Sequence, residues 1–279
     1  MSELYAVIGD PIGHSLSPAM HQFWYKNNHM ACHYHAFKVS ADDLADAVKG
    51  LKAIGIKGFN VTIPHKINIM PLLDHIDEEA KMLGAVNTVV NRGGELYGYN
   101  TDGLGFLLSL EKEVPEILKQ NPKVLIIGAG GAARAVGLTL AKHAELKQLD
   151  ISNRTIDKAK RLSSECEPLT KTRALSLEEA KGRLPDYDLI INGTSLGMAP
   201  HTDQTPIAIM PSERRQVFVD LIYRPLKTAW LRQAEAEGHT VLNGLPMLIY
   251  QGALAFNHWF GFMPDTKGMQ MFLERKLED

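Results

Sequence analysis

This 279-residue sequence has few cysteines, little excess of acidic over basic residues and few long apolar runs. It has only two cysteines, Cys32 and Cys166, far apart and without metal-ligand spacing. Two isolated thiols exclude a disulfide-stabilised scaffold and suit a reducing compartment, so we expect a cytoplasmic protein. The eleven histidines form no H-E-x-x-H or comparable pattern. We therefore assign no metal.

The charge balance also excludes classes of partner. Thirty basic and 32 acidic residues give a net charge of −2, with no long block of one sign. We therefore expect neither nucleic acid nor membrane as a partner. The first residues, MSELYAVIGDPIG, lack a basic region and reach Asp10 and Pro11 before any apolar run is long enough for a signal or membrane helix. With 45% apolar and 22% charged residues, the composition is typical of a globular protein.

Short β-branched runs alternate with helical patterns, which predicts an α/β fold with a mostly parallel sheet. Strands are predicted at residues 4–9, 33–39, 58–63, 124–128, 149–152, 188–192 and 217–222. Apolar residues recur every three or four residues over 43–55 and 132–146, as in helices that connect the strands of a parallel sheet. Two alternating segments flank Gly93-Gly94, which predicts a hairpin within residues 85–103.

A charged segment with two prolines, residues 111–123, precedes a new strand and predicts an exposed connection between two domains. We expect an N-terminal α/β domain over residues 1–110 and a second domain over 111–243. From Gly244 onward the pattern is helical. Periodicity does not decide where that segment packs.

The run VLIIGAGGAARAVGLTLAK predicts a phosphate-binding loop, because a strand, a glycine turn and a helix follow one another. Gly128, Gly130 and Ala133 occupy the G-x-G-x-x-G/A positions. Gly128 allows a tight turn, and Gly130 lets the backbone approach a pyrophosphate. The helix from Gly131 directs unpaired N–H groups at the anion. The alternative is a close-packed turn without a ligand.

The end of the next predicted strand indicates which dinucleotide binds. Asn153, Arg154 and Thr155 stand there, whereas Asp150 falls in mid-strand and should point away from the ribose. A guanidinium suits a 2′-phosphate and a carboxylate would repel one, so we predict NADP. Alternatively, Asn153 or Thr155 only caps the following helix and Arg154 is a solvated charge.

Polar side chains gather after the strands of the first domain, where ligands of open α/β sheets bind. They are Ser15, Ser17, Asn60, Thr62, Lys66, Asn87, Thr88, Asn100, Thr101 and Asp102. Each also has a structural interpretation. Ser17 could be an N-cap ahead of Pro18, and Asn60 and Asn87 could be buried structural amides. Lys66 could be a solvated charge and Asp102 a cap.

The sequence resembles the shikimate dehydrogenase family over nearly its whole length. The motifs that carry the resemblance are GDPIGHSLSP, GFNVTIPHK, GAVNTV, YNTDG, GAGGAAR, SNRT, NGTSLGM, DLIYRPLKT and GLPMLIYQGALAF. The resemblance implies an N-terminal substrate-binding domain, completed by C-terminal helices over 244–279, and an NADP-binding Rossmann domain. It implies the NADP-dependent, reversible reduction of 3-dehydroshikimate to shikimate in the shikimate pathway, which leads to chorismate and the aromatic amino acids.

The resemblance also implies roles for individual residues. Lys66 and Asp102 would be the catalytic proton-transfer pair. The substrate carboxylate would be held by Ser15 and Ser17, and the remaining substrate contacts would be Asn60, Thr62, Asn87, Tyr223 and Gln251. The cofactor contacts would be Gly128, Ala129, Gly130, Gly131 and Ala132 at the diphosphate, Asn153, Arg154 and Thr155 at the 2′-phosphate, and Thr194, Met198 and Gly244 at the nicotinamide half. Where the family often has a second arginine, this chain has Lys158. A homodimer is the assembly that we expect.

Three rival interpretations follow from the same residues. A quinate dehydrogenase would favour NAD and an acid at the strand end, against which Arg154 argues. A non-catalytic NADP-dependent sensor would not need Lys66 and Asp102. Other Rossmann dehydrogenases should lack the paired serines and NVTIPHK.

Overall fold

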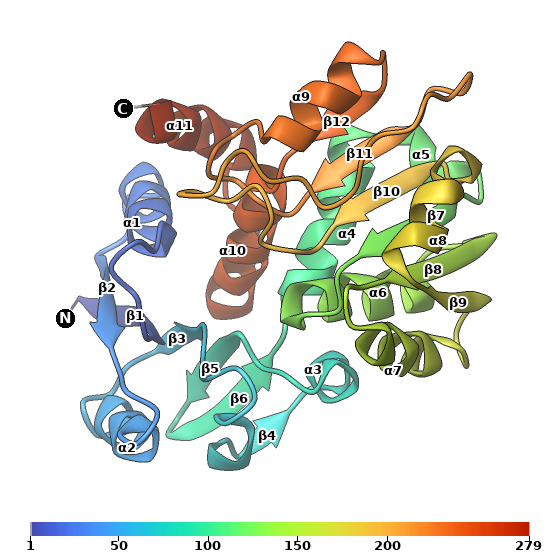
Figure 1. Ribbon diagram of the computed structural model, residues 1–279. Coiled ribbons are helices and arrows are strands. Elements are labelled where there is room, and N and C mark those ends of the chain that lie inside the picture. The colour runs from blue at the N-terminus through green and yellow to red at the C-terminus, as the bar shows by residue number, and fades with distance from the viewer. Residues whose placement is uncertain (1, 279) are drawn as a thin grey trace. The chain divides into compact units, whose positions relative to one another are not determined.

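The computed structural model describes residues 2–278, and the chain separates into two units (Figure 1). One unit ends at Thr101 and also contains Gln251–Leu273. The other comprises Asp102–Tyr250 and the residues from Glu274. Each unit has its own six-stranded sheet with helices, so the predicted two-domain α/β class is confirmed.

The first unit is built on a mixed sheet with the strand order β2-β1-β3-β5-β6-β4. Its elements are β1 (Glu3–Gly9), α1 (Ser17–Asn27), β2 (Cys32–Lys38), α2 (Leu44–Ala53), β3 (Gly58–Val61), a 3-10 turn (Met70–Leu72), β4 (His75–Ile76), α3 (Glu78–Leu83), β5 (Thr88–Arg92) and β6 (Glu95–Tyr99). The predicted hairpin is present, because β5 and β6 pair antiparallel on either side of Gly93-Gly94. Both glycines have positive φ angles, 64° and 97°, which such a turn requires.

Alternating side chains of β1 pack against different helices of this unit. Ala6 and Ile8 belong to a core with Val48 of α2. Tyr5, on the opposite face, contacts Trp259 of α10 (Leu245–Phe260) at a ring distance of 5.0 Å. Because successive strand residues face opposite sides of a sheet, helices cover both of its faces.

The second unit has a fully parallel sheet with the order β12-β11-β10-β7-β8-β9. Its elements are α4 (Asp102–Glu113), α5 (Glu116–Lys119), β7 (Lys123–Ile127), α6 (Gly131–His143), β8 (Gln148–Ser152), α7 (Ile156–Cys166), β9 (Thr172–Leu175), α8 (Leu177–Gly182), a 3-10 turn (Leu184–Asp186), β10 (Leu189–Asn192), β11 (Val217–Asp220), α9 (Ala229–Ala236) and β12 (Thr240–Leu242). Helix α11 (Thr266–Glu278) ends the described chain. This is the strand order of a dinucleotide-binding Rossmann fold.

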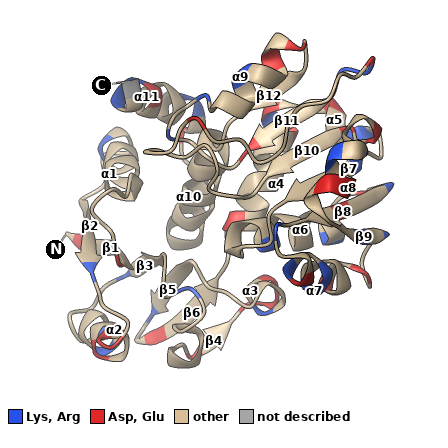
Figure 2. Cartoon of the chain, viewed as in Figure 1, with Lys and Arg blue, Asp and Glu red and all other residues tan. Residues whose placement is uncertain are grey.

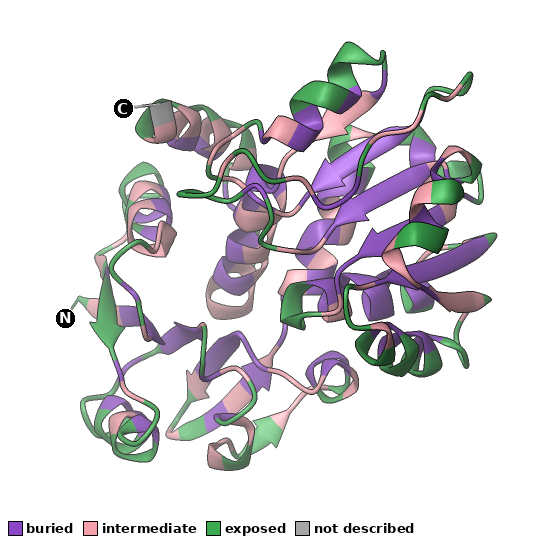
Figure 3. Ribbon diagram, viewed as in Figure 1, coloured by how far each residue is buried: buried purple, intermediate pink, exposed green. Residues whose placement is uncertain are grey.

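Buried strands form the centre of the second unit (Figure 3). Leu125 and Ile127 of β7 share a core with Trp230 of α9. Ile126 lies on the other face, where it approaches Gly137 of α6. Charged residues lie on helices such as α7, whereas β10 carries none (Figure 2). The continuous apolar strands therefore reflect a sheet covered on both faces.

The structure differs from the sequence-based prediction at two points. The first is that the boundary falls before α4 rather than within residues 111–123, because Gly103 packs tightly against Thr139 of α6. The supposed connection contains α5, with Pro115 at its N-cap and Pro122 buried. The second is that β4, β9 and β12 were not among the predicted strands. β4 and β12 have two and three residues, too few for a period, and β9 (TRAL) lacks the apolar run that marks the predicted strands.

Candidate active site

The glycine turn between β7 and α6 has the backbone geometry that the motif predicts. Gly128 has a φ of +116°, and its N–H donates to the Ser152 carbonyl over 2.7 Å. A Cβ at this position would lie 2.9 Å from the Gly193 carbonyl group, so only glycine fits. A Cβ on Gly130 or Gly131 would meet nothing within 4 Å. The start of α6 is thus open to a ligand, with helix N–H groups lacking helical partners.

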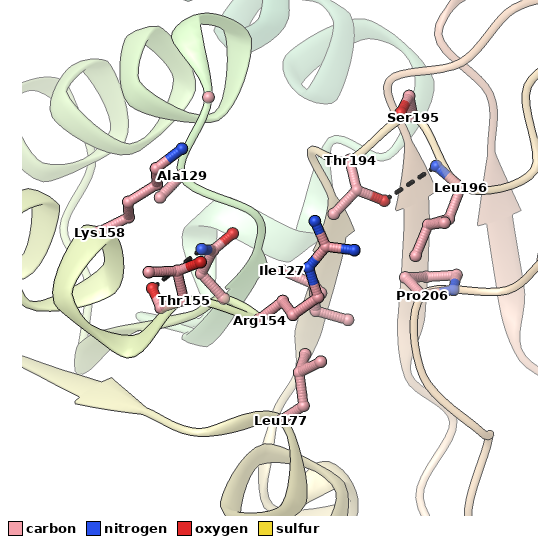
Figure 4. Close-up of a pocket in the computed structure, with 12 residues that line it drawn as sticks. Ile127, Ala129, Arg154, Thr155, Lys158, Leu177, Thr194, Ser195, Leu196 and Pro206 are labelled. Atoms are coloured by element: carbon pink, nitrogen blue, oxygen red, sulfur yellow. Dashed lines mark hydrogen bonds between the residues drawn. The ribbon is translucent and has the colours of Figure 1, made fainter.

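A pocket of about 270 Å³ opens beside this turn, at the carboxyl ends of the parallel strands (Figure 4). Its lining residues are Ile127, Ala129, Gly130, Asn153, Arg154, Thr155, Lys158, Leu177, Thr194, Ser195, Leu196 and Pro206. Six predicted cofactor residues are among them, namely Ala129, Gly130, Asn153, Arg154, Thr155 and Thr194. The predicted contacts Gly128, Gly131, Ala132, Met198 and Gly244 are not in this lining.

Two positively charged side chains line the pocket. Arg154 and Lys158 are exposed there, and none of the twelve residues drawn in Figure 4 is acidic. Asp150 lies in the middle of β8 with its side chain fully buried. Burial alone would raise its pKa, but hydrogen bonds from Arg173, Tyr187 and Gln148 outweigh burial and lower it. The nearby carboxylate of β8 is thus paired within the protein, and the pocket suits an anion.

A buried polar network holds the loop on the opposite wall of this pocket. Thr194 donates to Asn192 Oδ1 over 2.7 Å and accepts from the Leu196 N–H. Asn192 in turn donates to Asp220 at the end of β11 over 3.1 Å. Burial raises the pKa of Asp220 to about 6, although hydrogen bonds from Ile222, Thr228 and Asn192 oppose the shift. These bonds fix the backbone that follows β10 at the pocket wall.

The alternative interpretation, in which Ser17 and Thr155 only cap helices, does not match the structure. Leu16, not Ser17, is the N-cap of α1, and Ser17 is the first helical residue. Thr155 occupies the N-cap of α7 without a side-chain cap bond. Asn153 donates to the Thr155 carbonyl over 3.0 Å and so shapes the turn before α7.

In the first unit, two predicted substrate residues lie in a buried hydrogen-bond network. Asn60 donates to the Asn87 carbonyl and to Thr88 Oγ1, each over 3.1 Å. Asn87 donates to Thr101 Oγ1 over 2.9 Å, and its Oδ1 accepts from the Thr101 N–H. The structural interpretation of these amides is therefore partly correct. Asn60 is nevertheless 7% exposed.

The other predicted side chains are distributed over both units. Ser15, Ser17, Thr62, Lys66 and Gln251 belong to the first unit, whereas Asp102 and Tyr223 belong to the second. Ser15 Oγ accepts from the Ser17 N–H over 3.3 Å, which shows that the paired serines share one turn. Lys66 is half-buried, and its carbonyl accepts from the Val86 N–H over 2.7 Å. Asp102 is the first residue of α4.

Several residues around these groups have no role in the sequence-based prediction. Ser195 and Leu196 line the pocket from within the NGTSLGM motif, Leu177 lines it from the start of α8, and Pro206 lines it from a loop. Tyr34 donates to Asn60 Oδ1 over 2.7 Å from β2, where nothing but strand alternation marks it. Only pairing across the sheet could have found it.

Among residues 2–278, no three His, Cys, Asp or Glu side chains converge as metal ligands would. No helix in the same range has the length and apolarity that crossing a membrane requires.

The parallel sheet, the glycine turn and the pocket with two cations define an oxidoreductase-type Rossmann unit that suits a phosphorylated dinucleotide. Comparison with known families agrees with this class. Residues 7–89 match the shikimate dehydrogenase substrate-binding domain, residues 110–225 the shikimate/quinate 5-dehydrogenase domain, and residues 244–271 the C-terminal domain of shikimate 5′-dehydrogenase.

Individual relatives cover the whole chain. A shikimate dehydrogenase (NADP+) of Bacillus cereus strain AH820 is 48% identical over 277 residues, 99% of each chain. A crystal structure of shikimate dehydrogenase with NADP+ is 41% identical with a TM-score of 0.90, over 99% of this chain and 96% of the other. The Thermus thermophilus enzyme with NADP(H) and shikimate is 36% identical with a TM-score of 0.86, over 98% and 99%. The chain belongs to the shikimate dehydrogenase (NADP+) family.

Proposed function

We propose that this protein reversibly reduces 3-dehydroshikimate to shikimate with NADPH, as a step toward chorismate and the aromatic amino acids. The pocket of the second unit, which has a glycine turn and two cations but no acid, is the observation that carries the proposal. The first unit would bind the substrate and the second the cofactor. We further propose a cytoplasmic location, which cell fractionation would test, and a homodimer, which size-exclusion chromatography with light scattering would test.

The residues of the second unit fit NADP at both ends of its diphosphate. The open backbone at Gly130 and Gly131 accommodates an anion without displacing a side chain. Arg154 would pair with the 2′-phosphate through its planar guanidinium, and Lys158 would add a second charge. Because lysine cannot form two parallel bonds, its contribution would be charge rather than geometry. Thr194 would border the nicotinamide half, together with Met198 and Gly244.

The residues of the first unit supply the polar groups that a hydroxylated ring acid needs. Ser15 and Ser17 lie on one turn at the start of α1, where N–H groups favour a carboxylate. Asn60, Thr62, Asn87 and Gln251 would bond the ring hydroxyls. Tyr223, whose pKa burial raises despite the opposing charge of Arg224, would remain protonated beside the substrate.

The chemistry requires a proton as well as a hydride. The cofactor, when bound, supplies the hydride to the carbonyl carbon. The Lys66 ammonium would then donate a proton to the carbonyl oxygen, and its positive charge would stabilise the negative charge that develops there. Asp102 would orient this ammonium and favour its protonated form. In the oxidation of shikimate the same pair would accept the proton.

Replacing Lys66 by alanine tests the catalytic pair. We expect Lys66→Ala to lower kcat by about 10²- to 10⁴-fold, because a general acid is lost, while the Kd for NADP stays unchanged. Lys49, an exposed lysine of α2, is the matched control, and Lys49→Ala should retain full activity. Initial rates of shikimate oxidation and NADP titrations measure both. Unchanged turnover in Lys66→Ala would remove this residue from the mechanism.

The same assay applied to the unmodified protein separates the rival functions. Rates with shikimate and NADP should exceed those with NAD or with quinate. A preference for quinate or NAD would retain the fold and reject our substrate or cofactor assignment. Absence of turnover with every pair would favour a non-catalytic sensor.

A further inference from the structure

A buried carboxylate lies next to the loop that forms one wall of the pocket beside the glycine turn. Asp220 is the last residue of β11, and its side chain is fully buried. Asn192 Nδ2 and the Ile222 N–H donate to Asp220 Oδ1 over 3.1 and 3.0 Å, and the Thr228 hydroxyl donates to Oδ2 over 2.9 Å. All three donors are uncharged. Neutral groups of the protein therefore hold this carboxylate in place.

The carboxylate decides which way the amide of Asn192 faces. Burial raises the pKa of Asp220 to about 6, but the group is still mostly ionised at neutral pH and can then only accept hydrogen bonds. Asn192 must therefore turn its Nδ2 toward Asp220. In that orientation its Oδ1 accepts from the Thr194 N–H over 3.0 Å and from the Thr194 hydroxyl over 2.7 Å. An inverted amide would place two acceptors together at Asp220 and two donors together at the Thr194 N–H.

The same amide also binds the loop that lines the pocket. Asn192 Nδ2 donates to the Leu196 carbonyl over 3.3 Å, and the Leu196 N–H donates to Thr194 Oγ1 over 3.1 Å. Thr194, Ser195 and Leu196 line the pocket together with Arg154 (Figure 4). Ser195 and Leu196 are exposed, so buried packing contributes little to their positions. The position of this loop therefore depends on the buried amide to which it is bonded.

We propose that Asp220 is a positioning residue for the dinucleotide. By fixing the orientation of Asn192, it holds residues 194–196 in the conformation that forms the pocket wall, although Asp220 itself does not line the pocket. A loop that is already ordered loses less conformational entropy when a ligand binds against it, so the carboxylate increases the affinity for NADP. This inference rests on the proposed function, because that function places NADP in this pocket.

Two substitutions of nearly equal shape test this role. Asp220→Leu removes both acceptor oxygens, and we expect it to raise the Kd for NADP about 5- to 20-fold, because Asn192 loses the partner that orients it. Asp220→Asn keeps one oxygen for Asn192 and the Ile222 N–H and gives the Thr228 oxygen a donor, so it should leave this Kd within about threefold. Isothermal titration with NADP, without shikimate, measures both values.

Gln216→Met is the matched control, because it alters a buried polar group at the other end of the same strand. Gln216 directly precedes β11 and donates to the Leu184 and Tyr187 carbonyls over 2.8 and 2.6 Å. Gln216→Met should lower the free energy of unfolding in urea but leave the Kd for NADP within about twofold, since neither partner lines the pocket. If Asp220→Leu also lowers only the free energy of unfolding, its role is structural and the inference is overturned. Equal Kd values for Asp220→Leu and Asp220→Asn would overturn it as well.

A further variant tests the link without altering Asp220, in case Asp220→Leu does not fold. Asn192→Leu removes the connecting amide and should also raise the Kd for NADP about 5- to 20-fold. The double variant should bind NADP within about twofold of the weaker single variant, because the second substitution removes nothing further. An unchanged Kd in Asn192→Leu, or single effects that multiply, would overturn the inference. If the unmodified protein binds NADP but does not oxidise shikimate, the proposed function fails, and the Kd values still decide the role of Asp220.

Discussion

A buried histidine shows how strongly one residue depends on its surroundings. His21 is fully buried among aromatic rings, and Tyr34 and Trp24 are two of its neighbours. Burial lowers its pKa from 6.5 to about 3, because no hydrogen bond or opposite charge compensates the charged form. His21 is therefore neutral under ordinary conditions and packs as an aromatic ring.

This pKa gives the folded state a specific pH dependence. The unfolded chain binds a proton at His21 below pH 6.5, whereas the folded chain does so only near pH 3, so this residue costs stability as the pH falls between these values. Relative to His21→Phe, the protein should lose about 1.4 kcal/mol of unfolding free energy per pH unit there. Urea unfolding of both proteins at pH 7.5, 6 and 4.5 measures the difference. Parallel stability curves would contradict this assignment.

At the scale of elements, close helix contacts decide where the proposed catalytic acid stands. Helix α4 begins at Asp102, and the next residue, Gly103, is buried. A Cβ on Gly103 would lie 1.9 Å from Thr139 Oγ1 and 2.9 Å from the Ala135 carbonyl oxygen of α6. The absence of a side chain thus sets the distance between α4 and α6 at the end that carries Asp102.

Adding one methyl group at this contact should displace the start of α4. We expect Gly103→Ala to lower the unfolding free energy by about 1–3 kcal/mol through overpacking, and to lower kcat by shifting Asp102. Gly137→Ala in α6 is the control, because a Cβ there would meet Ile126 at an ordinary 3.4 Å. It should be neutral or slightly stabilising. Urea unfolding and initial rates measure both variants, and equal behaviour would refute the packing argument.

At the scale of the whole molecule, the chain completes its first unit with residues from near its end. Trp259 of α10 donates from Nε1 to the Val89 carbonyl over 3.0 Å, and a Cβ on Gly58 would lie 2.2 Å from the same nitrogen. Trp24 donates to the Asp265 carbonyl over 2.8 Å. The first sheet therefore buries one face only when Gln251–Leu273 is present.

Truncating Trp259 should weaken the first unit and spare the cofactor pocket of the second. We expect Trp259→Ala to cost about 3 kcal/mol of unfolding free energy, as for other large-to-small changes at packed tryptophans. Trp259→Phe should cost about 1 kcal/mol, because it keeps most of the packing but loses the indole N–H bond to the Val89 carbonyl. NADP affinity should stay within twofold in both. A large loss of NADP affinity in Trp259→Phe would contradict this independence.

Features that depend on local periodicity and backbone chemistry could be predicted from the residues alone. The strand, turn and helix around Gly128 and the hairpin at Gly93-Gly94 follow from residues close in the chain, where glycine alone permits the required φ angles. The family and its cofactor were also predictable, because its motifs are short and contiguous. Roles inferred from them, such as those of Lys66 and Asp102, stay predictions.

Contacts between residues far apart in the chain became known only from the folded structure. Strands of three residues or fewer, such as β4 and β12, carry too little pattern to be recognised and exist through pairing with their neighbours. Tyr34 becomes a partner of Asn60 because the parallel register of β1 with β2 and β3 brings them together. The placement of α4 with α6, and of Trp259 on the first sheet, depends on packing between segments far apart in the chain, which periodicity within either segment does not encode.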